Sequence, residues 1–571
     1  MKKILLFLIS AMVLTGSMAF AMGGQGATCN PSTAGWPNCT LATVPVREHV
    51  TRTVNIPAGH YTAPYIADQA NTEYILQGDI TADSTAITVK ASYVVINLNG
   101  HTITYNQVSP GEGVNIGTWN RTHIAVVNGS ILQGAAMSEG TSGGAGNNPV
   151  SFYNTDLGGF RPASYVHVAN LYVKYGGRDV AGLNLGQGGD YCLIEQSTVE
   201  DTYEFGTLKN RHAGVRALTV GAGRHCIVRN NTIVNARQGG IDVKRDAEVY
   251  GNHVTVRSIA PNSAGIGGWE VENIKIYNNT VVASGESPLG IGVAQEINQS
   301  RNVEIYNNII DSKTTALGSE YGSSQQCFTE SHTCGLTAIG INIRGYRTVS
   351  VDNLRVYNNK ITINNDAWYR GTYSPTGEAV WVNGKAKGFS INMRGTEKGF
   401  FYNNHVTVLD KDGKGLAFGV SFPGNTSSGM FFINNTVIAN VANVVFGDSY
   451  GASQGHPLVA GNHLVKVDDY PTYATFHAGG WHDGTGRVVD NTYSGGASVD
   501  SLNFNAAANG ILSIYFGTFV DNTILYNYRY HDNNGTSASL IRDYYNPPIS
   551  LNYAVPTELL PPVGLRIFIN Q

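Results

Sequence analysis

The chain has 571 residues, a formal net charge of −4 and 14% charged residues, well below the share of about 25% in ordinary globular proteins. This weakly acidic balance excludes the strongly basic surface that binds polyanions without specificity, and we expect no nucleic-acid partner. The 68 glycines are typical of an all-β protein with many turns.

The first 21 residues have the three parts of a bacterial Sec-type signal peptide. Lys2 and Lys3 supply the positive start, residues 4–13 the apolar run, and residues 19–21 the small-x-small cleavage site. The apolar run is too short to cross a bilayer, and no later segment is long and apolar enough to do so. We therefore expect a secreted or periplasmic protein without a membrane span, and attachment to the cell surface stays open.

Residues 22–73 follow the signal peptide. We expect them to form an N-terminal cap, because the first coil of a solenoid would otherwise expose its core and a strand edge.

The six cysteines fall into three pairs, which fits an oxidising compartment. The pairs are Cys29 with Cys39, Cys192 with Cys226, and Cys327 with Cys334. Cys192 and Cys226 occupy the same inward position in two successive repeats, so they form either a disulfide or a pair of buried thiols.

A short repeat organises the centre of the chain. In the copies CIVRNNTIV, AEVYGNHVTV and IKIYNNTVV, apolar residues alternate with polar ones on both sides of a corner. The second corner residues Asn231, Asn252 and Asn279 are 21 and 27 residues apart. Alternation with a period of two predicts β-strands, and a repeat of this length predicts a solenoid. The pattern therefore predicts a parallel β-helix of about a dozen coils over residues 74–493.

Each coil is expected to place its corner residue in one column, so that Asn side chains form a hydrogen-bonded ladder across coils about 4.8 Å apart. The column consists of Gly100, Gly129, Asn170, Ser197, Asn231, Asn252, Asn279, Asn308, Asn359, Asn404, Asn435, Asn462 and Asn491. A second column points outward and either stabilises the coils by ring stacking or binds sugar. It consists of Tyr250, Tyr277, Tyr306, Tyr357 and Tyr402.

Residues 94–103, with the sequence VVINLNGHTI, resemble a known family. They are similar to the entry coils of the pectate-lyase-like superfamily of right-handed parallel β-helices, and the resemblance extends over residues 74–493. It implies a right-handed parallel β-helix solenoid. It implies no single activity, because the superfamily contains lyases, hydrolases, epimerases, phage tailspikes and non-catalytic surface proteins.

One strand in each coil carries the candidate site. Aligned by their inward residues, these strands have one outward column of Asn184, Asp242, Gly267, Gly292, Asn342 and Trp381. Outward glycines would leave a floor without side chains, on which a chain-like ligand can lie. Insertions before Ala213 and Thr337 are expected to form walls beside this floor.

Charged residues around the floor suit the cleavage of an acidic polysaccharide. We assign catalytic roles to Asp242, Lys244, Glu270, His212 and Arg216, and substrate binding to Arg245, Trp269, Asn342, Arg344 and Trp381. β-Elimination needs a cation beside the uronate and a base for the α-proton. Lys244 or Arg216 would be the base and His212 the proton donor. Asp242 or Glu270 would orient them or hold a cation.

Two functions stay open. The first is an enzyme, with a polysaccharide lyase ahead of a glycoside hydrolase, which would need Asp242 and Glu270 about 5–10 Å apart. The second is a non-catalytic surface or matrix protein that binds glycans or has a structural role, in which the charges form an ordinary solvated patch. Residue spacing predicts no metal site, and Ca²⁺ is the one cofactor left open.

The repeat is lost after Tyr493. Residues 494–571 are aromatic-rich and then proline-rich. We expect them to form a C-terminal β-rich cap with a Pro-rich tail.

Overall fold

The computed structural model describes residues 24–30, 38–44, 49–116, 121–136, 148–152, 163–176, 182–184, 190–202, 218–221, 224–236, 239–258, 264–269, 271–285, 288–294, 300–314, 337–344, 351–365, 369–372, 379–382, 385–392, 399–410, 416–422, 430–440, 442–446, 453–454, 458–467, 476–483, 485–489, 491–494, 502–506, 511–515 and 528–532. These residues form 50 strands and no α-helix. No helix among them is long and apolar enough to cross a membrane.

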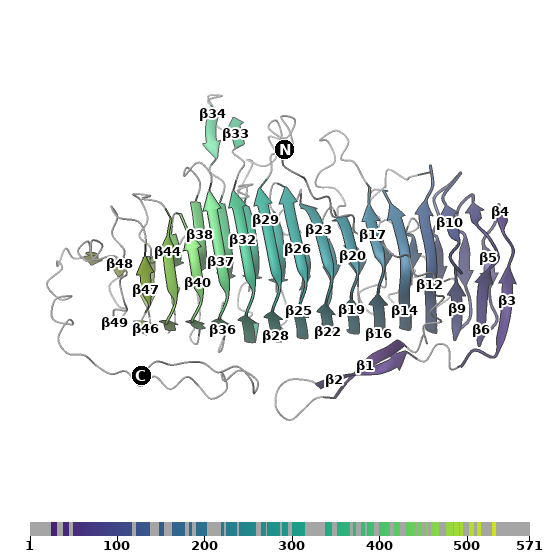
Figure 1. Ribbon diagram of the computed structural model, residues 1–571, viewed down its shortest axis with the longest axis horizontal. Helices are drawn as coiled ribbons and strands as arrows, with labels where there is room; N and C mark the ends of the chain where they lie inside the picture. The colour runs from purple at the N-terminus through teal and green to yellow at the C-terminus, as the bar shows by residue number, and fades with distance from the viewer. Residues whose placement is uncertain are drawn as a thin grey trace, which may run out of the picture.

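A coil consists of three strands, as in β22 (Arg245–Tyr250), β23 (His253–Ser258) and β24 (Ala264–Trp269). Each strand pairs in parallel with its equivalent in the next coil. The coils stack into the elongated molecule shown in Figure 1. The predicted all-β parallel β-helix is therefore confirmed.

The equivalent strands form three sheets. The first sheet, in the lower row of Figure 1, contains β3 (Arg52–Ile56), β6 (Thr72–Leu76), β9 (Val94–Asn97), β16 (Asp190–Glu195), β19 (Arg224–Arg229), β22, β25 (Glu272–Tyr277), β28 (Ser300–Tyr306), β31 (Val351–Tyr357), β36 (Gly399–Tyr402), β39 (Met430–Ile433), β43 (Leu458–Ala460), β46 (Thr485–Val489) and β49 (Ile511–Tyr515). The second sheet, in the upper row, contains β4 (Gly59–Tyr61), β7 (Ile80–Ala82), β10 (Thr102–Tyr105), β17 (Thr198–Asp201), β20 (Thr232–Ala236), β23, β26 (Thr280–Gly285), β29 (Ile309–Thr314), β32 (Lys360–Asn365), β37 (His405–Asp410), β40 (Thr436–Ala439), β44 (His463–Lys466) and β47 (Thr492–Ser494). The long strands β12 (Thr122–Gln133) and β14 (Ser164–Tyr175) belong to both of these sheets.

The third sheet contains β5 (Tyr65–Ala67), β8 (Ile87–Val89), β11 (Val114–Ile116), β13 (Val150–Ser151), β15 (Leu183–Asn184), β18 (Leu218–Gly221), β21 (Gly239–Asp242), β24, β27 (Leu289–Ala294), β30 (Thr337–Arg344), β35 (Lys385–Asn392), β38 (Leu416–Phe422), β41 (Ala442–Phe446), β42 (Ser453–Gln454), β45 (Phe476–Asp483), β48 (Leu502–Ala506) and β50 (Tyr528–Asp532). Two antiparallel hairpins lie outside the coils. They are β1 (Gly24–Asn30) with β2 (Asn38–Val44), and β33 (Tyr369–Thr372) with β34 (Ala379–Val382).

Parallel pairing extends beyond the boundaries 74 and 493 that the repeat indicated. It begins at β3, which pairs with β6, and it continues to β50, which pairs with β48. Residues 52–67 therefore form the first coil of the helix.

The core is one continuous apolar cluster inside the coils. Inward residues from all three sheets contribute to it, and Ile274, Ile276 and Val281 have no exposed surface. Equivalent residues stack from coil to coil, so burial of the apolar columns is the main stabilising contribution along the whole length.

The asparagine ladder is confirmed from Asn231 to Asn491. Each Asn Nδ2 donates to the Oδ1 of the next ladder Asn, for example Asn252 to Asn279 and Asn279 to Asn308, both at 3.0 Å. The residue before each ladder Asn from Asn231 to Asn462, such as Asn278 with φ 54°, adopts the left-handed conformation that turns the corner. This explains the Asn-Asn pairs in the repeat.

The first part of the expected column is shifted by one residue. Thr102 pairs with Ser130 and Gly129 pairs with Leu171, so Gly100 and Asn170 lie one position before the column. Both have positive φ and belong to the left-handed corner position. Each corner has a left-handed position followed by a ladder position. Where only one of the two is Asn or Gly, the sequence does not show which position that residue occupies.

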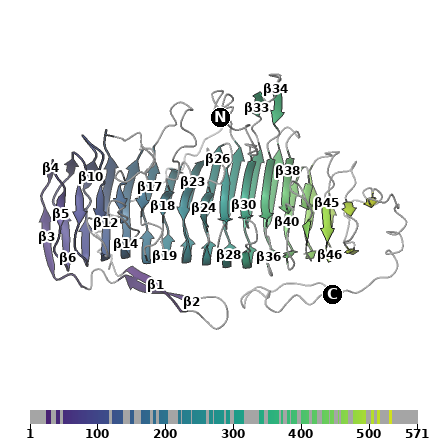
Figure 2. The same ribbon diagram turned by 180° about the vertical axis from the view of Figure 1, so that it is seen from behind.

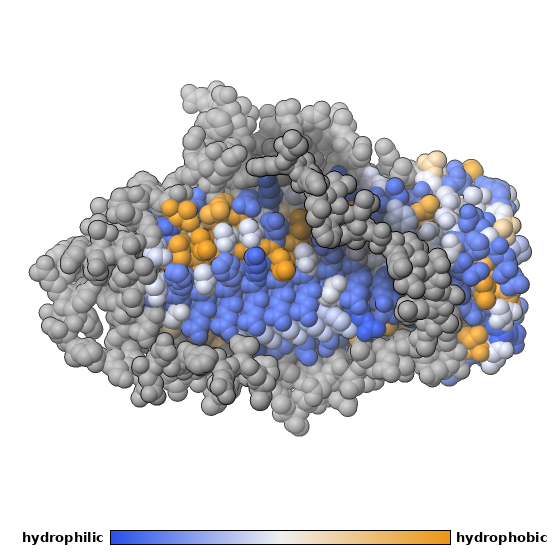
Figure 3. All heavy atoms as spheres, viewed as in Figure 1, coloured by the Kyte–Doolittle hydropathy of each residue, from blue (hydrophilic) through white to orange (hydrophobic). Residues whose placement is uncertain are grey.

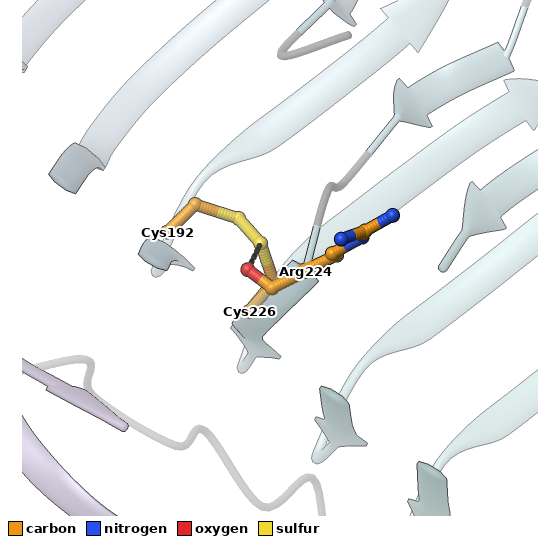
Figure 4. Close-up of a disulfide and its surroundings, with 3 residues drawn as sticks. All are labelled: Cys192, Arg224 and Cys226. Carbon is orange, nitrogen blue, oxygen red and sulfur yellow. Dashed lines mark hydrogen bonds between the residues drawn. A yellow bond between two sulfur atoms is a disulfide. The ribbon is translucent and has the colours of Figure 1, made fainter. Parts of the chain in front are cut away.

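A disulfide joins Cys192 and Cys226, whose Cα atoms are paired in register and 4.4 Å apart. Figure 4 shows the bond crossing from β16 to β19, with the carbonyl oxygen of Arg224 3.3 Å from Cys226 Sγ. Cys29 and Cys39 are directly opposite each other in the β1–β2 hairpin, and a bond between them stays a prediction. Cys327 and Cys334 lie outside the described residues.

The outward tyrosine column is a ring stack. Centroids of consecutive rings from Tyr250 to Tyr402 are 4.8–4.9 Å apart and the rings are nearly parallel. The three middle rings are covered on both faces by their neighbours, which leaves no ring face for a sugar. The stack therefore stabilises the coils.

Candidate functional site

The candidate site lies on the outer face of the third sheet, whose strands β18, β24 and β30 are labelled in Figure 2. Strand pairing places Asp242 beside Gly267, Gly267 beside Gly292, and Gly292 beside Asn342. In the other direction Asp242 pairs with Gly221, which pairs with Asn184. We call Asp242, Gly267, Gly292 and Asn342 the central row.

Trp381 does not belong to this column, and its alignment was wrong. It pairs with Arg370 in the antiparallel β33–β34 hairpin, which projects from the coils at the top of Figure 1. The register position next to Asn342 is held by Ser390 of β35. In residues 379–382, AVWV, Trp381 lies between two valines, as an outward residue does in a coil strand. These residues instead pair with residues 369–372, YRGT, and the two segments form a local hairpin.

Arg245 is also not beside the row. It lies on β22 of the first sheet, where its Nε is 3.9 Å from Glu272 Oε2. Arg301 approaches the same carboxylate at 2.5 Å. The cross-strand charges explain Arg245 without a ligand.

A second row of predicted residues follows two positions further along the third sheet. Trp269 pairs with Ala294, and Ala294 pairs with Arg344. Lys244 lies outside this row, between the end of β21 and the start of β22, where its carbonyl oxygen accepts a hydrogen bond from the backbone N–H of Glu272 at 3.0 Å. Glu270, His212 and Arg216 lie outside the described residues, so their roles stay predictions.

The outward glycines of the central row are sites of close packing. A Cβ added to Gly267 would lie 2.7 Å from the carbonyl oxygen of Gly292 and 3.0 Å from Cβ of Ala264. A Cβ added to Gly292 would lie 3.0 Å from the side chain of Leu289. Neighbouring small and apolar groups, among them Ala264 and Leu289, thus fill the space that side chains would need. Gly267 is buried, whereas Gly292 and Asn342 are partly exposed.

Asp242 is the chemically distinctive group of the row. Its side chain keeps part of its surface accessible, but protein atoms replace most of the water around it. Burial raises the pKa of Asp242 to about 7, and the positive charge of Lys244 opposes this rise. The carboxyl can therefore take up or release a proton near neutral pH.

The sequence interpretation missed a column of inward glycines in the strands of the third sheet. The column consists of Gly240, Gly265, Gly290, Gly340, Gly388 and Gly419. A Cβ added to Gly340 would lie 2.4 Å from Cγ2 of Ile361 in the second sheet and 2.6 Å from the carbonyl oxygen of Gly388. The glycines let the second and third sheets meet closely. The signal was available, since each glycine directly precedes an apolar residue in the sequence.

A metal site does not emerge from the described residues. They contain no group of three or more His, Cys, Asp or Glu side chains that could hold a metal ion. Ca²⁺ requires six to eight oxygen ligands, and Asp242 is the one carboxylic acid among the strand residues of β18, β21, β24, β27 and β30. The residues described around the central row do not fit a calcium ion.

No protein-family model and no curated protein matches the chain. Solved structures similar to it include the catalytic unit of a thermostable GH87 α-1,3-glucanase from Streptomyces thermodiastaticus, with 13% identity, a TM-score of 0.29, and coverage of 83% of this chain and 65% of that one. A double mutant of the tailspike protein of E. coli bacteriophage HK620 in complex with a pentasaccharide has 10% identity, a TM-score of 0.38 and coverage of 86% and 82%. The A-module of the Azotobacter vinelandii mannuronan C-5 epimerase AlgE6 has 11% identity, a TM-score of 0.26 and coverage of 78% and 90%.

This chain therefore spans less than two thirds of the glucanase structure. At these identities and TM-scores the similarity decides neither fold nor activity. The strand pairing alone shows that the chain is a parallel β-helix, the fold that its resemblance to the pectate-lyase-like superfamily implied.

Proposed function

We propose that the protein binds an acidic polysaccharide along the central row and cleaves it by β-elimination, with Asp242 as the group that moves the proton. The observation that carries the proposal is the position of Asp242. It is the one carboxylic acid among the strand residues of five consecutive strands of the third sheet, and it stands beside the row of Gly267 and Gly292.

The chemistry follows from the two neighbouring charges. Asp242 as carboxylate accepts the α-proton of a uronic acid residue, and the electron pair of the broken C–H bond forms a C=C bond. The glycosidic oxygen leaves with the electrons of its C–O bond and takes up a proton, for which His212 is the proposed donor. The ammonium group of Lys244 would neutralise the substrate carboxylate, which makes the α-proton more acidic. From the sequence, Lys244 or Arg216 was the expected base. The raised pKa of Asp242 favours Asp242 in that role because a base works best when its pKa is near the working pH.

Hydrolysis is less well supported. It needs a second carboxyl group about 5–10 Å from the first, and the described strands around the central row contain only Asp242. Glu270 would have to supply the second group.

The test is an activity screen of the mature protein on acidic and neutral polysaccharides, followed by ultraviolet absorbance of the unsaturated product. We expect Asp242→Asn to lower the rate by about 100-fold or more. Asp311→Asn is the matched control, because Asp311 is exposed on the second sheet, and it should leave the rate unchanged. Equal rates for Asp242→Asn and the parent would refute the role of Asp242.

A parent protein that binds an acidic polysaccharide without cleaving it would instead support the non-catalytic function. A parent that releases reducing ends without an unsaturated product would identify a hydrolase.

A further inference from the structure

Charged side chains follow the outer face of the first sheet in two rows, and their signs alternate from strand to strand. The first row consists of Glu248, Lys275, Glu304 and Arg355, which strand pairing places side by side. The second row lies three residues earlier on the strands and contains Arg245, Glu272 and Arg301. We call these seven residues, together with Tyr250, Tyr277, Tyr306 and Tyr357, the polar face. A continuous hydrophilic band crosses the middle of the molecule in Figure 3.

Within one molecule, neighbouring charges of the polar face already attract each other. Lys275 Nζ lies 3.7 Å from Glu248 Oε1. Arg301 Nε lies 2.5 Å from Glu272 Oε1. The side chains are still partly accessible, with exposed fractions of 16% at Glu248, 24% at Lys275 and 59% at Arg301. Carboxylate, ammonium and guanidinium groups each form several hydrogen bonds, so these internal contacts leave capacity for a partner.

The first row is complementary to its own reverse. A two-fold axis parallel to the strands, between β25 and β28, would reverse the order of the coils in a second copy. Lys275 would then lie opposite the partner's Glu304. In the same way Glu248 would lie opposite the partner's Arg355. Each charge of the row thus meets a charge of opposite sign, which favours this orientation of two copies.

The second row has the same centre. The axis between β25 and β28 would place Glu272 opposite the partner's Arg301. The first row is also bounded symmetrically, because the next position beyond each end is held by a buried apolar residue, Ile227 on β19 and Phe400 on β36. The charges therefore extend equally far on both sides of one axis.

The tyrosines of the polar face fit this axis as well. Tyr277 would lie opposite the partner's Tyr306, and Tyr250 opposite the partner's Tyr357. An axis along the coils, between the two charged rows, would also join opposite charges. The tyrosines would then face residues before the start of the strands, so the copies would share less of the sheet. Tyrosine and arginine are both enriched in protein interfaces.

We propose that two copies of the protein associate through the polar face, with antiparallel coil axes and a two-fold axis between β25 and β28. The four strands cover about 400 Å² on each copy at a strand spacing of about 4.8 Å. This is about half of the 800 Å² that each partner buries in a standard interface. We therefore expect a weak and reversible dimer, in which the charges determine the orientation. The central row lies on the third sheet and takes no part in this contact.

The first experiment is analytical ultracentrifugation of the mature protein from about 1 µM to 1 mM. We expect the average mass to approach that of a dimer as the concentration rises. The dissociation constant should increase several-fold between about 0.05 M and 0.5 M salt, because salt screens partly exposed charges. A protein that stays monomeric, or a dimer that is insensitive to salt, would overturn the proposal.

The second experiment exchanges two charges across the axis. Lys275→Glu should weaken the dimer at least about tenfold, because it opposes the partner's Glu304 with a like charge. The double variant Lys275→Glu with Glu304→Lys should restore the dimer, since opposite charges again face each other. Within one sheet the double variant puts like charges side by side, so a purely internal role of the charges predicts no restoration.

The control for these variants is Lys360→Glu, which reverses an exposed lysine on β32 of the second sheet and should leave the dissociation constant unchanged. A dimer that Lys275→Glu does not weaken, or that the double variant does not restore, would contradict the proposal. The salt dependence uses the parent alone, so it decides the case in which a variant fails to fold.

Discussion

Asp242 shows how a single side chain obtains a property that its sequence neighbours do not reveal. Seen in the sequence, Asp242 and Lys244 resemble an exposed ion pair that can be replaced with little effect on stability. In the structure protein atoms replace most of the water around the carboxyl, and this burial outweighs the attraction of Lys244, so the pKa of Asp242 rises to about 7. This change in environment has a measurable consequence for stability.

The Asp242→Asn variant should gain stability relative to the parent as the pH rises. The folded-state pKa exceeds the unfolded value of about 3.9, so between about pH 4 and pH 7 the folded state binds more protons than the unfolded state. The contribution of Asp242 to stability is therefore present below pH 4 and lost as the pH rises to 7. Melting temperatures measured from pH 4 to pH 7.5 should show a growing advantage for Asp242→Asn. A difference that does not change with pH would contradict the raised pKa.

The ladder asparagines are structural residues with no spare hydrogen-bonding capacity. Asn279 accepts bonds from the backbone N–H and Nδ2 of Asn252, and its own Nδ2 donates to Val249, Tyr277 and Asn308. Asn279→Ala should therefore lower the free energy of unfolding by about 2–3 kcal/mol, because several buried groups lose their partners.

The matched control for Asn279 is the preceding corner residue. Asn278→Gly should change the free energy of unfolding by less than about 1 kcal/mol, since glycine adopts φ 54° without strain. Urea denaturation of both variants measures the difference. If Asn279→Ala and Asn278→Gly lower the free energy of unfolding equally, the hydrogen bonds of the ladder do not stabilise the fold more than the corner conformation does.

At the level of the strands, the inward glycines determine how closely the second and third sheets approach. Gly340→Ala should cost about 3 kcal/mol, because the new methyl group would collide with Ile361 and with the backbone of the next coil. Gly100→Ala meets no atom within 4 Å and should cost about 1 kcal/mol, from its positive φ alone. Denaturation midpoints measure both, and a smaller loss at Gly340 than at Gly100 would contradict this packing.

For the whole molecule, stacked apolar columns should matter more than the disulfide between Cys192 and Cys226. Reduction of Cys192–Cys226, which closes a loop with a sequence separation of 34 residues, should lower the free energy of unfolding by about 2–4 kcal/mol. The far-ultraviolet circular dichroism should stay unchanged, because the core continues through all coils. Loss of the β-sheet spectrum on reduction would show that the disulfide is needed for the fold.

The repeat predicted the fold because the alternation of inward apolar and outward residues recurs from coil to coil, and the corner asparagines recur from Asn231 to Asn491. It also placed Asp242, Gly267, Gly292 and Asn342 in one row, since each is fixed by the inward residue beside it. The hairpin containing Trp381 was missed because its alternation matches a coil strand, and only its pairing partner distinguishes the two. The pKa of Asp242 was not predictable, because it depends on how much the folded chain shields the carboxyl from water.

The central claim is that Asp242 transfers the proton in polysaccharide cleavage, and the pH dependence of kcat/KM tests it most directly. The parent should show an ionisation near pH 7, with higher activity above it, because the carboxylate is the active form. Lys244→Gln should move this ionisation to higher pH, because the lysine charge lowers the pKa of Asp242. An ionisation that stays at the same pH in Lys244→Gln, together with activity retained in Asp242→Asn, would contradict the claim.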